Sequence, residues 1–164
     1  MPKLFTVLII FALLPFCGMS QCTGSLPSLI FSDQLQLKEA SWTQINSIAQ
    51  QIKNTPECKI KAQGHGSSSK VTQQLSWSRV NAVIRHFVEK QGISPSRFIF
   101  EYGNEGDPNT VDLVFTNEDG PSTVPSPHPN LRNIQEPSLH GPPSNSTPQH
   151  KPKFRPGKHN HKTK

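Results

Sequence analysis

The chain has 164 residues and a formal net charge of +6, which is enough length for one modest domain with extensions. All 11 acidic residues and 11 of the 17 basic residues lie in residues 1–150, so the net positive charge belongs to residues 151–164. The sequence shows no phosphate-binding loop, no Cys/His metal spacing and no catalytic signature, so we expect neither an enzyme nor a bound cofactor or metal.

The N-terminal residues have the pattern of a secretory signal peptide. Lys3 precedes an apolar run of 13 residues, Leu4 to Phe16, which is shorter than the roughly 20 residues that a membrane span needs. Small residues at Gly18 and Ser20 suit a cleavage site. We therefore expect residues 1–20 to be removed from an exported protein with no membrane span.

Two cysteines, Cys22 and Cys58, remain after this cleavage. In an exported chain they are expected to form a disulfide, which would stabilise the fold by about 3–4 kcal/mol. The alternative is a pair of free thiols. Acylation of Cys17 or Cys22 is a further alternative, although the residue before each of these cysteines is not small.

Hydrophobic spacing predicts six elements in the order β-α-β-α-β-β. They are a strand over 29–31, a helix over 39–54, a strand over 58–63, a helix with its apolar stripe at Val80–Val88, and strands over 97–102 and 111–115. Ser76 is expected to cap the second helix, and Gly92 lies just past its end. This order predicts an α+β fold, an α/β sandwich with helices packed on a small mixed sheet.

The composition changes after Phe115. Residues 116–164 hold 10 of the 16 prolines and one aromatic residue, Phe154, so we expect a disordered, proline-rich tail. The domain would then span residues 28–115, after a short segment at 21–27. The basic end could bind anionic polymers or simply aid solubility, and His150, His159 and His161 could hold a transition metal weakly.

Five short motifs follow one another within the predicted domain. They are Gly64-His65 after a strand, Leu75-Ser76-Trp77-Ser78-Arg79-Val80 at a helix, Gln91-Gly92-Ile93 after it, Tyr102-Gly103-Asn104-Glu105 with Pro108, and Asn109 with Val111-Asp112-Leu113. In order and spacing they resemble the OmpA C-terminal-like domain, the peptidoglycan-associating module of Gram-negative envelopes. The resemblance implies a protein of the periplasm or the outer-membrane surface.

The resemblance also implies a site for the diaminopimelate of the peptidoglycan stem peptide. In that family an aspartate takes the ligand's ammonium and an arginine takes its carboxylate through paired hydrogen bonds. Arg79 matches the arginine, but Ser67 stands at the aspartate position, the loop is shorter, and Thr110 replaces an arginine pair. The expected ligand-binding residues are Arg79, Ser67, Thr72, Gly66 and Ser76.

These departures leave two main hypotheses for function. In the first, the domain binds peptidoglycan non-covalently through Arg79. In the second, it is a structural or accessory subunit of an envelope complex that keeps the fold without wall binding, with the cationic tail as an interaction arm. Arg79 could also be only a solvated residue of the first helical turn, and the tail alone could be the functional part.

Overall fold

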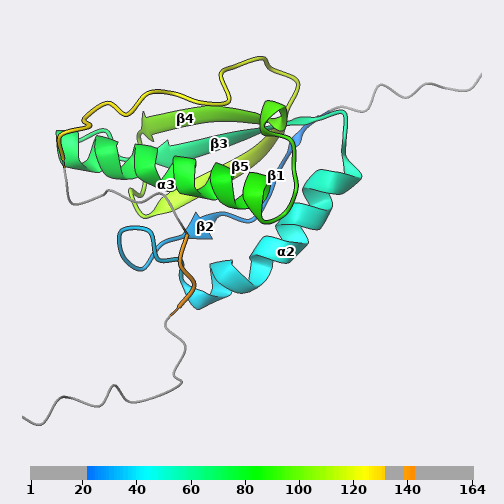
Figure 1. Cartoon of the computed structure of the whole chain (residues 1–164), viewed down its shortest axis with the longest axis horizontal. Helices are drawn as coiled ribbons and strands as arrows, with labels where there is room; N and C mark the ends of the chain where they lie inside the picture. The colour runs from blue at the N-terminus through cyan, green and yellow to red at the C-terminus, as the bar shows by residue number, and fades with distance from the viewer. Residues whose placement is uncertain (1–21, 132–138, 143–164) are drawn as a thin grey trace, which may run out of the picture.

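The computed structural model of the protein describes residues 22–131 and 139–142. The elements are β1 (Gly24–Ser25), β2 (Leu29–Ile30), α2 (Glu39–Asn54), β3 (Lys59–His65), α3 (Lys70–Glu89), the 3-10 helix η2 (Pro95–Arg97), β4 (Phe98–Asn104) and β5 (Thr110–Thr116). The expected α+β fold is confirmed (Figure 1). The predicted signal peptide, the basic end and its three histidines lie outside the described residues.

The strands form one small mixed sheet in the order β1-β5-β3-β4, and β2 also pairs with β5. β3 and β5 are antiparallel, whereas β3 and β4 are parallel and are joined through α3. β3 alternates between the two faces of the sheet, with Ile60, Ala62 and Gly64 buried. This alternation places the strand between a helical layer and a polar face.

The core lies between the sheet and the two helices. Its α2 members are at the helical spacing expected from the sequence: Ile45, Ile48, Ala49 and Ile52. Helix α3 approaches β3 very closely at Gly64, where an added Cβ would lie 2.6 Å from both Ser76 Oγ and Val80 Cγ2. Only glycine leaves room for this approach.

Helix α3 begins earlier than predicted. Its N-cap is Ser69, which exchanges capping hydrogen bonds with Thr72, so Ser76 lies inside the helix and the predicted cap at Ser76 is wrong. The early turns carry few apolar residues and are held by packing of polar side chains, including Gln74 and Ser76.

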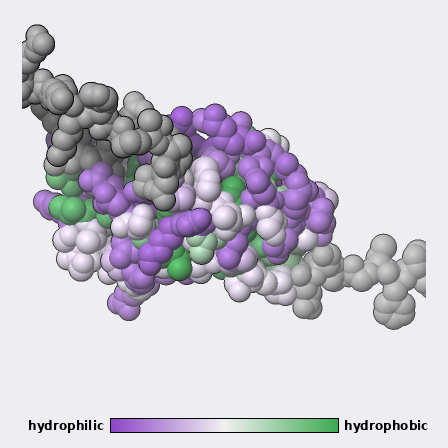
Figure 2. Space-filling view, turned by 90° about the horizontal axis from the view of Figure 1, so that it is seen from below, coloured by the Kyte–Doolittle hydropathy of each residue, from purple (hydrophilic) through white to green (hydrophobic). Residues whose placement is uncertain are grey.

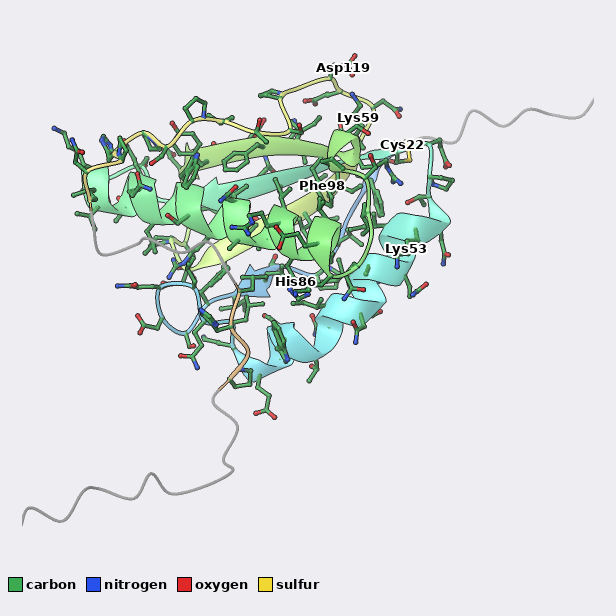
Figure 3. The ribbon with its side chains drawn as sticks, viewed as in Figure 1. Cys22, Lys53, Lys59, His86, Phe98 and Asp119 are labelled. Carbon is green, nitrogen blue, oxygen red and sulfur yellow. A yellow bond between two sulfur atoms is a disulfide. The ribbon has the colours of Figure 1, made fainter. Side chains whose placement is uncertain are left out.

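Residues 117–131, here called the belt, lie along the domain from the polar sheet face to α3. Glu118 and Asp119 form ion pairs with Lys61 and Lys59 on β3, and Figure 3 shows Lys59 and Asp119 close together. Gly120 then covers Ile99 so closely that a Cβ would lie 2.5 Å from Ile99 Cγ2. The belt therefore begins on the sheet face opposite the helices.

The belt next covers the open edge of β4 and reaches α3. The Phe100 amide donates to the Pro121 carbonyl over 2.8 Å, and Trp77 Nε1 donates to the Val124 carbonyl over 2.8 Å. This part of the predicted disordered tail has a physical function in the fold, because β4 is an edge strand whose main-chain groups need partners. Residues 139–142, the other described part of the tail, lie against residues 35–37.

The predicted disulfide between Cys22 and Cys58 is present and is drawn as a yellow bond near the Cys22 label in Figure 3. It joins the segment before β1 to the start of β3. Strand β1 is only two residues long and has no sequence pattern that predicts it. In the described part of the chain, no helix is both long and apolar enough to cross a membrane.

Reduction of the disulfide should lower the free energy of unfolding by about 3–4 kcal/mol, because the bond closes a loop of 36 residues in sequence separation. The measurement is urea denaturation of the oxidised protein and of a Cys22→Ser, Cys58→Ser double variant. The variant should unfold at lower urea. Equal midpoints in the two curves would contradict a stabilising bond.

Candidate functional site

Arg79, the expected ligand-binding residue, lies in the middle of α3 with only 2% of its surface exposed. It is therefore not the solvated first-turn residue that the sequence also allowed. Its guanidinium lies over the ring of Phe31, with Cζ 4.8 Å from the ring centroid. A buried cation of this size needs hydrogen-bond acceptors close by.

The acceptors come from two loops of the chain itself. Nε donates to the Gln34 carbonyl over 2.8 Å and Nη2 donates to the Asp33 carbonyl over 3.1 Å. Nη1 donates to the Pro108 carbonyl and, over 3.4 Å, to the Asn109 side-chain oxygen. The fork that would receive a ligand carboxylate is thus filled by main-chain and amide oxygens.

Both loops are fixed next to Arg79 by their own contacts. The first is closed by the antiparallel bridge between Phe31 and Leu37 and by the hydrogen bond from the Ser32 amide to the Gln36 carbonyl. The second is turned by Asp107, whose carbonyl and carboxylate accept from Thr110 and from Asn109. The guanidinium therefore joins α3 to the connections before α2 and before β5.

Burial lowers the pKa of Arg79 to about 10, and the charges of Asp107 and Asp33 oppose that shift. Arg79 is still positively charged at neutral pH. The charge is nevertheless enclosed, so a carboxylate from outside would have to displace the loop oxygens before it could bind.

The other four expected ligand residues do not gather around an open guanidinium. Ser76 is buried and accepts a 3.0 Å hydrogen bond from the Gly103 amide. Thr72 is engaged in the helix cap, and Gly66 has a φ of 128° with its amide bonded to the Asn104 carbonyl. Ser67 alone among them is exposed.

His65 lies in a polar network that the sequence did not reveal. Its Nδ1 is 2.7 Å from the Glu105 carbonyl, and its Nε2 is 2.8 Å from Asp112, which also accepts from Ser28. The ring also packs against Gly106, where a Cβ would lie 2.6 Å from Nδ1. These contacts hold His65 in the turn at the end of β3, and no metal-binding cluster is found among the described residues.

A hollow lies between α2 and α3. His86 on α3 contacts Trp42 on α2 edge to face, with ring centroids 5.6 Å apart. Figure 3 labels His86 on the side of α3 that faces α2. Trp42 and His86 border this hollow, which is a cavity of about 400 Å³. The residues that line it are Trp42, Ile45, Asn46, His86, Lys90, Gln91 and Leu139.

The face of the molecule drawn in Figure 2 is mostly hydrophilic, with hydrophobic residues in small separate areas. The large hydrophobic residues that are most exposed in the described ranges are Val71 and Leu131.

Comparison with known proteins gave no match to a protein-family model and no match to a curated protein.

Replacing Arg79 by lysine should lower the free energy of unfolding by about 3 kcal/mol or more, since one ammonium cannot satisfy acceptors on two loops. Urea denaturation measures this loss without any ligand present. Arg85→Lys on the same helix is the matched control, because Arg85 is exposed and, within the described part of the chain, forms an ion pair with Glu89. Equal stability of the two variants would contradict a structural role for Arg79.

Acidification should destabilise the protein through His86. Burial, and secondarily the charge of Lys90, lowers the pKa of His86 below its ordinary value of about 6.5. The unfolded state therefore takes up the proton first, so this contribution to stability is complete above pH 6.5 and is lost as the pH falls through the lowered pKa.

Denaturation of the wild type and of His86→Gln at pH 7.5 and 5.5 measures this contribution. The variant should lose less stability than the wild type over the same pH interval. Equal losses would show that protonation of His86 does not differ between the folded and unfolded states.

Proposed function

We propose that the chain is a non-enzymatic, exported cell-envelope protein that acts as a structural or accessory interaction module. In this proposal it keeps the OmpA-like order of elements but no longer holds diaminopimelate. The observation that carries the proposal is the closed state of Arg79, whose guanidinium is bonded to Asp33, Gln34, Pro108 and Asn109 and has 2% of its surface exposed.

The exposed side of the expected site gives further support. Ser67 is neutral where a carboxylate would meet the ligand's ammonium. Hydrogen bonds to charged groups contribute about 1.5–3 kcal/mol, against about 0.5–1.5 kcal/mol for neutral ones. The chain thus has neither an open cation for the ligand's carboxylate nor an anion for its ammonium at the expected positions.

Peptidoglycan binding is the second candidate function. The observation in its favour is that the oxygens around Arg79 belong to residues 33, 34, 108 and 109, all of which are exposed. If these loops open, the same arginine fork becomes free to hold a stem-peptide carboxylate. The free energy needed to open the loops would then weaken the apparent affinity for the stem peptide.

The basic residues at 151–164 add a separate proposal that rests on the sequence alone. A cationic arm would attract anionic wall polymer, lipopolysaccharide or nucleic acid, and salt would weaken that attraction. Salt dependence therefore separates binding by this arm from binding at Arg79.

The deciding experiment is co-sedimentation of residues 21–164 with diaminopimelate-type sacculi at low and high salt. We expect any wild-type binding to disappear at high salt, because it would come from the basic arm. Saturable binding that persists at high salt and is competed by free diaminopimelate would overturn the proposed function in favour of the second candidate.

Ser67→Asp and Ser68→Asp form a matched pair for the same assay. Both add one carboxylate at an exposed position of the loop before α3, but only position 67 corresponds to the family's aspartate. Salt-resistant binding gained by Ser67→Asp alone would show that the missing carboxylate is the decisive loss. No gain in either variant would show that the loops over Arg79 also exclude the ligand.

A further inference from the structure

Residues 139–142 lie against the connection between β2 and α2, where Figure 1 shows them as a short orange segment beside these elements. The segment is not part of the sheet. Its position places Leu139 next to the hollow between α2 and α3.

The main chain of this segment forms hydrogen bonds with residues 35–37, as an added β-strand would. His140 forms a parallel bridge with Gln36, donating its amide to the Leu35 carbonyl over 3.2 Å. The Leu37 amide donates to the His140 carbonyl over 3.0 Å. The side chain of His140 is exposed, so these bonds do not require histidine.

The residues on either side of His140 supply side-chain selectivity. Leu139 packs against the hydrophobic core and lines the cavity of about 400 Å³ with Trp42 and His86. Gly141 lies against Trp42, where an added Cβ would be 2.8 Å from Cε2 and 3.0 Å from Nε1. The site thus accepts an aliphatic side chain, then any residue, then glycine.

The surface formed by residues 35–37, Trp42 and His86 is called the groove below. We propose that the groove is a binding site for an extended peptide of the pattern Leu-x-Gly from a partner chain. The segment 139–142 is its tethered occupant. Two main-chain hydrogen bonds, one leucine and one glycine make up the recognition, and any partner that carries the same pattern reproduces them. The groove does not depend on whether the chain binds peptidoglycan.

The tethered segment sets the affinity that a partner must have. Because the segment belongs to the same chain, its effective concentration at the groove is on the order of millimolar, so a free peptide competes poorly until the tethered segment is released. A partner that presents several copies of the pattern, or a second contact, would exchange with it more readily.

The groove shares a loop with Arg79. Leu35 and Leu37 hold the segment, while the neighbouring carbonyls of Asp33 and Gln34 accept from the guanidinium. An occupied groove therefore steadies one of the two loops that enclose Arg79.

The test uses hydrogen exchange of residues 21–164 and reads the Leu37 amide, whose acceptor is His140. Gly141→Val should expel the segment and raise the exchange rate of this amide by about tenfold or more, while amides of β3 and β5 stay protected. His140→Ala is the matched control, because its main-chain bonds remain, and it should keep wild-type protection.

A synthetic peptide with the sequence EPSLHGPPS, residues 136–144, is then added to Gly141→Val. It should restore protection of Leu37 and shift the indole N–H resonance of Trp42, whereas the same peptide with valine for glycine should do neither. Leu139→Ala gives a second released variant if Gly141→Val does not fold. Unchanged Leu37 protection in both variants, or no effect of the peptide at millimolar concentration, would overturn the proposal.

Discussion

A single buried cation determines how the connections of this domain are arranged. Arg79 is on the helix that crosses from β3 to β4, and its donors reach the loop before α2 and the loop before β5. Because an enclosed guanidinium without acceptors is very costly, both loops must keep their oxygens directed at it. The arginine that the sequence analysis expected to hold a ligand therefore serves the fold.

The rest of the structure shows how a small domain compensates for a limited core. The disulfide fixes the segment before β1 to β3, and the belt covers the edge of β4 and the outer side of Trp77. Each device joins parts of the chain that are far apart in sequence. Together they add stabilising contacts beyond those of two helices on one sheet.

The elements with a clear hydrophobic period could be predicted from the sequence. The first helix has the predicted limits, and the three longer strands agree with prediction to within two residues at each end. The start of α3 was missed because its polar residues are buried by distant partners. Gln74 accepts from Ser126 and His128, and such contacts leave no periodic pattern.

The candidate site could be predicted only in part, for a related reason. The sequence marked Arg79 as an expected ligand-binding residue, but the charge of a residue does not reveal whether its partner is a ligand or the chain itself. The network around His65 and the docking of residues 139–142 depend on main-chain oxygens and on glycine contacts. These features appear only when the loops have a defined path.

The carbonyls around Arg79 also determine which changes the loops can tolerate. A carbonyl oxygen is present whatever the side chain, so residue types at positions 33, 34 and 108 can vary while the hydrogen bonds persist. An insertion or deletion has a different effect, because it moves every following oxygen along the backbone. Loop length is therefore the constrained property here, and loops of altered length would leave the arginine without its acceptors.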